Sequence, residues 1–247
     1  MSTLPQAEAA PPLFSVIVPA FDEEAYLPHC LDAIGRAADR LGAPVEVIVV
    51  DNMSHDATAR IARDWGARTV QTGVKCLSAI RNTGARTASG EYLVFIDADS
   101  YMSPNFLEAT REVLAGGKHI GGGVANVRVS RWSLGIAVHY AAGVAAALVT
   151  RLSAVAFYTT REAFWAAGGF DEARIAVEDV DFARRLKRLG RRRGLRYKHL
   201  FNAHVTTSAR KFDEFGDWAA FTHPGMIIGA LLNRRKAAEQ FWYRRRR

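Results

Sequence analysis

The sequence predicts an α/β fold with a mixed, mainly parallel central sheet and helices on both of its faces. Short runs of consecutive apolar residues, many of them β-branched, recur at residues 14–18, 45–50 and 92–96. Amphipathic helical patterns separate these runs. Continuous apolar strands that alternate with helices are typical of a parallel sheet that is buried on both faces.

The elements of the first half each carry their own start and stop signals. The helix expected over residues 23–41 has apolar residues on one face and is stopped by Gly42 and Pro44. Pro104 stands at the start of a later helix, where its missing N–H costs little. In chain order we expect a strand over 14–18, a helix over 23–41, a strand over 45–50, a helix over 57–65, a strand over 68–71, a helix over 75–88, a strand over 92–96 and a helix over 105–114.

This alternation predicts a Rossmann-like nucleotide-binding half. The usual glycine fingerprint, G-x-G-x-x-G, does not follow the first strand, and the sequence has no G-x-x-x-x-G-K-[ST] phosphate loop. The glycines at residues 121–123 precede a strand expected over 124–129, which is too late in the chain for such a loop. Binding of NAD, binding of FAD and a P-loop are therefore disfavoured.

The second half is less regular. Residues 178–189 are predicted to form a helix with acids in its first turn and arginines toward its end, which is the orientation that the helix dipole favours. The other expected elements are strands over 154–160 and 195–201 and helices over 162–167, 212–221 and 226–232.

Composition and charge narrow the possible classes of protein. Of the 247 residues, 49% are hydrophobic and 23% are charged, which excludes disorder of the whole chain. Cys30 and Cys76 are too few for a disulfide scaffold or a cysteine-rich zinc site and fit a reducing, cytoplasmic compartment. The longest apolar stretch, residues 134–149, is shorter than the roughly 20 residues of a membrane-spanning helix, so we expect a buried or interfacial helix there.

The charge is unevenly distributed along the chain. The formal net charge is +8, with nine cations and no acid over residues 184–198 and seven cations against Glu239 over residues 234–247. The rest of the chain is therefore net acidic. Such asymmetry suggests contact with a phosphate group, an anionic lipid or a nucleic acid, although the first basic run also suits a solvated helix face.

Two carboxylates, Asp97 and Asp99, close the apolar strand expected over residues 92–96. In an open α/β sheet, ligands bind outside the carboxyl ends of the strands. Carboxylates spaced by two residues at such an end can both face Mg²⁺ or Mn²⁺, which prefer oxygen ligands and leave positions for phosphate. A solvated acidic turn is the alternative explanation of this spacing.

Four segments resemble the family 2 glycosyltransferases, which have the GT-A fold. The segments are SVIVPAFDEE at residues 15–24, VIVVDN at 47–52, AIRNTGARTASGEYLVFIDAD at 79–99, and GGFDE at 168–172 followed by Glu178 and Asp179. They occur in the order of the family and span about residues 14–190. Phe21 and Asp22 differ from the family pattern, in which Tyr and Asn are commoner at these two positions.

The resemblance implies a set of donor-binding residues. Pro19, Phe21 and Glu23 would frame the nucleoside. Asp51 would accept a hydrogen bond from uracil N3–H or guanine N1–H, which favours UDP- or GDP-sugars over CMP-sugars; a helix N-cap is its alternative role. Arg81 would pair with the base or a phosphate, unless it is a surface arginine.

The resemblance also implies a metal site and a catalytic base. Asp97 would reach the ribose or a metal-bound water, and Asp99 would bind the metal, with His204 completing its shell unless this histidine is a core or surface residue. Asp179 would take the proton of the acceptor hydroxyl, beside Glu178. A pair of helix-capping acids is the structural alternative for these two residues.

The function expected from the sequence is a metal-dependent inverting glycosyltransferase that uses a nucleotide-diphosphate sugar and Mg²⁺ or Mn²⁺. The alternatives are a sugar nucleotidyltransferase and a non-enzymatic protein that binds polyanions or membranes; no nucleic-acid partner is expected. Phe241, Trp242 and Tyr243 precede four arginines and favour contact with an anionic membrane surface on the cytoplasmic side, where a lipid could carry the acceptor.

The expected organisation has three parts. Residues 1–12 form a disordered leader, residues 13–222 form the glycosyltransferase domain, and residues 223–247 form a C-terminal helix with a basic, aromatic tail. Within the domain, residues 13–100 are the nucleotide-binding half and residues 101–222 the acceptor half.

Overall fold

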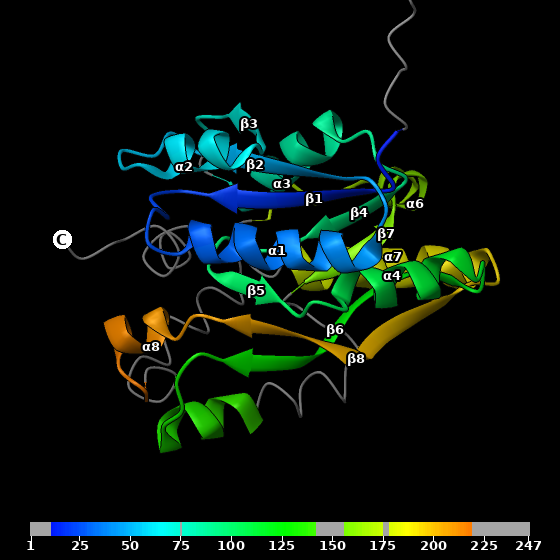
Figure 1. Cartoon of the computed structure of the whole chain (residues 1–247). Helices are drawn as coiled ribbons and strands as arrows, with labels where there is room; N and C mark the ends of the chain where they lie inside the picture. Colours follow the sequence, from blue (N-terminus) through cyan, green and yellow to red (C-terminus); the bar gives the residue numbers. More distant parts are fainter. Residues whose placement is uncertain (1–10, 75, 142–155, 175–177, 219–247) are drawn as a thin grey trace, which may run out of the picture.

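The strands form one mixed sheet whose spatial order departs from the chain order. The computed structural model describes residues 11–74, 76–141, 156–174 and 178–218 (Figure 1). The strands are β1 (Phe14–Ala20), β2 (Val45–Asp51), β3 (Arg68–Gln71), β4 (Tyr92–Phe95), β5 (Ser100–Met102), β6 (His119–Val129), β7 (Phe157–Thr160) and β8 (Arg196–Thr207). Their order across the sheet is β3-β2-β1-β4-β7-β6-β8-β5.

The pairing directions place most carboxyl ends at one edge of the sheet. β1 runs parallel to β2 and β4, and β2 runs parallel to β3. β7 is antiparallel to both β4 and β6, β6 is parallel to β8, and β5 is antiparallel to β8. The mixed, mainly parallel sheet expected from the sequence is therefore confirmed.

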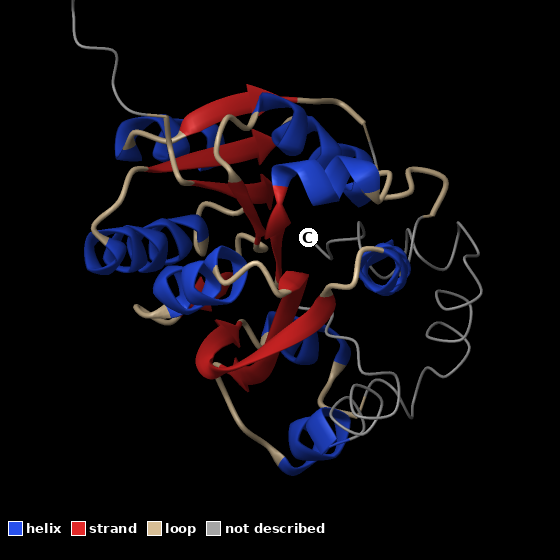
Figure 2. Ribbon diagram, turned by 90° about the vertical axis from the view of Figure 1, so that its right-hand side faces the viewer, coloured by secondary structure: helices blue, strands red, loops and turns tan. Residues whose placement is uncertain are grey.

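Helices cover both faces of this sheet (Figure 2). They are α1 (Leu27–Leu41), α2 (Thr58–Trp65), α3 (Leu77–Thr87), α4 (Phe106–Ala115), α6 (Arg161–Ala166), α7 (Glu178–Arg192) and α8 (Arg210–Phe215). Alternate residues of each central strand enter opposite cores. In β1, Val16 packs with residues of α1 and α4, whereas Ile17 packs with residues of α3, α6 and α7. This two-sided burial explains the continuous apolar runs of the sequence.

Several boundaries differ from those expected. α1 begins at Leu27 rather than at residue 23, because residues 23–26 form a turn before Pro28. β6 begins at His119, so the glycines at 121–123 lie within the strand rather than before it. A Cβ on Gly122 would lie 1.6 Å from the carbonyl oxygen of Lys198 in β8, which explains why only glycine fits there.

The second half holds two further differences. β8 continues to Thr207, past the expected end at residue 201, and the short strand β5 was not expected. The helix expected over 226–232, the tail and most of the leader lie outside the described residues, as does the end of the helix expected over 212–221. Among the described helices, none is long and apolar enough to cross a bilayer.

Candidate active site

The carboxyl ends of β1, β2 and β4 bring the predicted donor-side residues to one edge of the sheet. Pro19 lies in β1, in register with Val50 of β2, and Asp51 is the last residue of β2. Asp97 and Asp99 follow β4 in the turn that leads to β5. The sheet therefore gathers residues that are up to 80 positions apart in the chain, from Pro19 to Asp99.

Reciprocal hydrogen bonds join the loop after β1 to the loop after β2. The backbone N–H of Glu23 donates to Thr58 Oγ1 at 2.7 Å, and the backbone N–H of His55 donates to Asp22 Oδ1 at 2.7 Å. The ring of Phe21 meets the ring of His55 edge to face, with centroids 5.9 Å apart. Asp22 has a φ of 50°, a conformation that Asp tolerates better than most side chains. These contacts hold the segment that contains Phe21 and Glu23 in one conformation.

Asp51 is fully buried beneath these loops. Its Oδ1 accepts the backbone N–H of Ser54 at 3.1 Å, and its Oδ2 accepts Gln71 Nε2 at 3.2 Å. The N-cap residue of α2 is Ala57, so Asp51 is not a helix cap. An ionised carboxylate has about four acceptor sites, which leaves Asp51 with acceptor capacity for a further donor.

Arg81 connects the donor side to the predicted catalytic acids. This buried residue of α3 donates from Nη2 to Asp97 Oδ1 at 2.8 Å and from Nη1 to Glu178 Oε1 at 3.1 Å. Its guanidinium also lies 5.4 Å from the ring centre of Phe170. Arg81 is therefore not the surface arginine of the alternative explanation. Its Nη1 and Nη2 face protein carboxylates in this structure, and its expected contact with base or phosphate stays a prediction.

Asp179 has the environment of a base. Burial, followed by the charge of Glu178, raises the pKa of Asp179 to about 6, whereas Arg81 and the backbone N–H of Val180 act to lower it. The Val180 N–H donates to Asp179 Oδ1 at 2.7 Å. Such a carboxylate is a stronger proton acceptor than an ordinary aspartate and is still mostly ionised at neutral pH. Glu178, the other acid expected to be catalytic, is buried and accepts a hydrogen bond from Arg81, and its part in catalysis stays a prediction.

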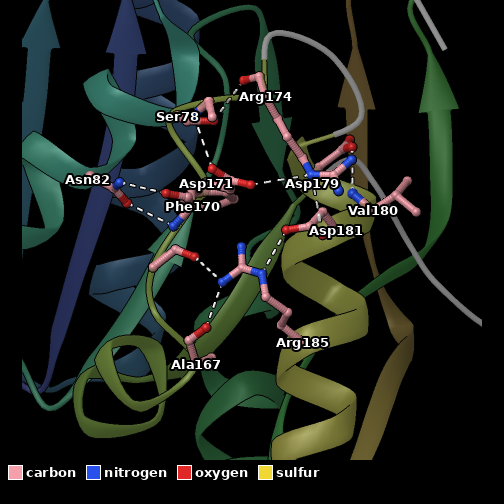
Figure 3. A network of polar contacts seen from close by, with 12 residues as sticks. Ser78, Asn82, Ala167, Phe170, Asp171, Arg174, Asp179, Val180, Asp181 and Arg185 are labelled. Atoms are coloured by element: carbon pink, nitrogen blue, oxygen red, sulfur yellow. Dashed lines mark hydrogen bonds and ion pairs between the residues drawn. The ribbon is translucent and has the colours of Figure 1, made fainter. Parts of the chain in front are cut away.

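A polar network supports the segment before Asp179 (Figure 3). The side chain of Asn82 donates to the carbonyl oxygen of Phe170 at 2.8 Å and accepts its N–H at 2.9 Å. Arg185 of α7 donates to Asp181 at 2.7 Å and to the carbonyl oxygen of Ala167 at 2.6 Å. Asp181 and Arg185 therefore connect the start of α7 to the glycine turn beside it.

Asp97 and Asp99 offer oxygen ligands of the kind that Mg²⁺ and Mn²⁺ prefer. The Asp97 side chain is 42% exposed and the Asp99 side chain is 13% exposed. Burial and the charges of Asp99, Asp97 and Glu23 raise the pKa of the Cys30 thiol. Within the described ranges, no three His, Cys, Asp or Glu side chains group closely enough to hold a metal. The residues fit a site that a phosphate ligand would complete.

The structure does not bring His204 to this site. The backbone N–H of Ser208 donates to the carbonyl oxygen of Asp99 at 2.9 Å, and His204 lies four positions earlier, inside β8. At about 3.3 Å per residue, the separation along the strand is about 13 Å. The backbone of His204 instead bonds to Ser103, at the far end of β5. The expected end of this strand at residue 201 was wrong. β8 continues to Thr207, so His204 lies within the strand rather than after it.

Arg210 takes a more central place than the sequence indicated. As the first residue of α8, it donates from Nη1 to Glu23 Oε2 at 2.6 Å, and its Nη2 lies 3.1 Å from Asp99 Oδ2. Arg210 and the next residue, Lys211, are two cations that could bind a diphosphate, and the side chain of Lys211 lies outside the described part. The sequence did hold a signal for this place of Arg210. The residue lies shortly after the end of β8, and ligands gather at the carboxyl ends of strands.

Comparisons with known proteins agree with this geometry. The family described as "Glycosyl transferase family 2" matches residues 15–154. The uncharacterized glycosyltransferase EpsJ of Bacillus subtilis (strain 168) is 32% identical over 106 residues, which cover 41% of this chain and 30% of EpsJ. The undecaprenyl-phosphate 4-deoxy-4-formamido-L-arabinose transferase of Aeromonas hydrophila is 31% identical over 130 residues, which cover 49% of this chain and 39% of that protein. These matches span less than half of either relative.

Solved structures share the fold. TarS residues 1–349 of S. aureus, in complex with UDP-GlcNAc, has a TM-score of 0.60 at 18% identity, covering 78% of this chain and 58% of that one. The mannosyltransferase PcManGT of Pyrobaculum calidifontis, in complex with GDP-Man and Mn²⁺, has a TM-score of 0.60 at 22% identity, covering 81% of this chain and 59% of that one. The GT-A fold expected from the sequence is thereby confirmed.

The environment of Asp179 gives a prediction that needs no substrate. In a carboxyl ¹³C NMR titration, Asp179 should titrate near pH 6. In Glu178→Gln the midpoint should be lower, because the neighbouring negative charge is removed and Arg81 loses a competing partner. Glu172→Gln, a change on the neighbouring loop, should leave the midpoint where it is. A midpoint that stays the same or rises in Glu178→Gln would contradict this account of the site.

Proposed function

This chain belongs to glycosyl transferase family 2, and we propose that it moves a sugar from a UDP- or GDP-sugar to an acceptor hydroxyl with inversion at the anomeric carbon. One observation carries the proposal: Arg81 bonds at once to Asp97 on the donor side and to Glu178 beside Asp179. Asp97, at the proposed phosphate-binding edge, and the proposed base Asp179 therefore lie on either side of Arg81. Family membership removes the support for the nucleotidyltransferase and for the non-enzymatic alternative.

The proposed donor follows from the end of β2. Asp51 is anchored by Ser54 and Gln71 and keeps acceptor capacity, which suits a base with a ring N–H, as in uracil or guanine. Pro19, Phe21 and Glu23 lie on the neighbouring strand end and in the loop after it, where a nucleoside would bind. The related folds bind UDP-GlcNAc and GDP-Man.

We assign the proposed cation to Asp97 and Asp99. Both carboxylates come from one turn, and PcManGT, which shares the fold, is in complex with Mn²⁺. A divalent cation held there would supply positive charge for the diphosphate that leaves the sugar. Arg210, beside Asp99, would add a fixed cation to the same side of the site.

Asp179 is the proposed catalytic base. The acceptor hydroxyl attacks the anomeric carbon from the face opposite the leaving diphosphate, and Asp179 takes its proton as the new bond forms. The pKa of about 6 lets the carboxylate both be ionised at neutral pH and accept the proton readily. Glu178 and Arg81 position this carboxylate next to the donor side.

The base assignment predicts a separation of binding from chemistry. Asp179→Asn should bind UDP or GDP as the wild type does but transfer sugar about 10²- to 10⁴-fold more slowly, because the amide has the same shape and cannot take a proton. Asp39→Asn, the same change on the exposed surface of α1, should transfer at the wild-type rate. Isothermal titration and single-turnover transfer assays measure the two quantities. Loss of nucleotide binding in step with the rate would show that Asp179 holds the donor site together instead.

We further propose a lipid-linked acceptor at the cytoplasmic face of a membrane. The name of the Aeromonas relative includes undecaprenyl phosphate, which is a lipid phosphate. In this chain Trp132 and Leu134 are 55% and 74% exposed, and most of the basic run at residues 184–198 is exposed on α7 and β8. Cys30 and Cys76 are free thiols, which suits a reducing compartment. The aromatic and arginine tail, residues 241–247, lies outside the described residues.

Charge reversal tests the tail directly. Replacing the four arginines at residues 244–247 by glutamate in the full chain should abolish cosedimentation with anionic vesicles at low salt, since each arginine near such a surface contributes about 1 kcal/mol. A matched variant with glutamate at Arg184, Arg188, Arg191 and Arg192 tests the basic run on α7. Hydrolysis of the donor sugar in solution should persist in both variants. Vesicle binding by the tail variant equal to that of the wild type would rule out the tail as the anchor.

A further inference from the structure

Arg210 lies where a cation beside Asp99 would bind. Its guanidinium bonds to Glu23 Oε2 at 2.6 Å, lies 3.1 Å from Asp99 Oδ2, and sits 5.1 Å from the ring centre of Tyr26. Tyr26 and Glu23 belong to the turn between β1 and α1, whereas Asp99 belongs to the turn after β4. Contacts from two separate segments therefore fix the guanidinium in one place.

This arrangement compensates buried negative charge. The side chains of Glu23 and Asp99 are 8% and 13% exposed, and a carboxylate so poorly solvated needs a cation or several hydrogen-bond donors nearby. Arg81 forms ion pairs with Asp97, on the other side of the same turn, and with Glu178. Arg210 is thus a cation that the described part of the chain places beside Asp99.

A divalent cation and Arg210 would compete for the same carboxylate. Two positive groups at Asp99 repel each other, and this repulsion is strong where solvent is largely excluded. A guanidinium binds phosphate as well as it binds carboxylate, often through two parallel hydrogen bonds. The diphosphate of a nucleotide would therefore offer Arg210 a second partner, and its negative charge would reduce the repulsion between the two cations.

We propose that Arg210 is a positioning residue that makes the binding of a divalent cation at Asp99 depend on a nucleotide diphosphate. In the protein without donor, Arg210 holds Asp99 and keeps the affinity for the cation low. When the diphosphate is bound, Arg210 and the cation share it, and the two ligands strengthen each other's binding reciprocally. The inference rests on the proposed metal site, but it concerns the order of assembly rather than the transfer reaction.

Mn²⁺ binding, followed by electron paramagnetic resonance, tests the inference without any turnover. Wild type, Arg210→Met and Arg210→Lys are titrated with Mn²⁺ alone and with Mn²⁺ in the presence of UDP or GDP. Wild type should bind Mn²⁺ at least about tenfold more tightly when the favoured nucleotide is present. Arg210→Met should bind Mn²⁺ alone about tenfold more tightly than wild type, since one neighbouring charge changes a binding equilibrium by about that factor. Arg210→Lys keeps the charge and should behave like wild type.

A matched control removes an arginine from a carboxylate elsewhere. Arg40 bonds to Glu108 at 2.9 Å on the surface formed by α1 and α4, at the end of α1 away from the site. Arg40→Met should leave Mn²⁺ affinity unchanged. If Arg210→Met fails to fold, Arg210→Gln, which also removes the charge, is titrated in its place. Equal Mn²⁺ affinity of the wild type with and without nucleotide would also overturn the inference.

The outcomes separate this inference from the proposed function. If Arg210→Met binds Mn²⁺ alone no more tightly than wild type, while Asp99→Asn loses Mn²⁺ binding, the inference is overturned and the metal site stands. If the wild type with UDP or GDP binds no more Mn²⁺ than the nucleotide binds in the absence of protein, both the metal site and the inference are wrong.

Discussion

The buried guanidinium of Arg81 is the interaction on which the site depends. It joins α3 to the turn after β4 through Asp97 and to the first turn of α7 through Glu178, and these partners are 16 and 97 residues away in the chain. A buried arginine is tolerated only where carboxylates compensate it, and buried carboxylates need the arginine in turn. The turn that carries Asp97 and the first turn of α7 are therefore held at a fixed spacing by this balance of charge.

The same principle recurs on the other side of the Asp97–Asp99 turn. Arg210 joins α8 to Glu23 across 187 residues of sequence and pairs with Asp99. Four acids of the site, Glu23, Asp97, Asp99 and Glu178, are thus each paired with an arginine that is distant in the sequence. A protein built in this way could exchange an internal cation for a ligand without leaving a buried charge uncompensated, which is the role proposed for Arg210.

Much of the fold could be predicted because its signals are local. The strands β1, β2 and β4 are buried on both faces, so their sequences are continuously apolar within a short window. β8 was predicted too short because polar residues interrupt its apolar pattern after Leu200, and His204 was misplaced as a result. The motif acids could be found from their positions at strand and helix ends. The partners of Arg81 and Arg210 could not, since these contacts join segments far apart in the chain and depend on the order of the strands.

The free energy of unfolding of Arg81→Met at two pH values tests the central claim most directly. Without the guanidinium, the neighbouring carboxylates repel one another and the pKa of Asp179 rises further in the folded state, so stability falls as the pH increases. We expect a loss of about 3 kcal/mol or more at pH 8 and a loss smaller by about 1.4 kcal/mol or more at pH 5, where protonation relieves the repulsion. Arg81→Lys, which keeps the charge, should show the weaker pH dependence. An equal loss at both pH values in Arg81→Met would mean that Arg81 contributes packing alone, and would contradict the charge balance proposed here.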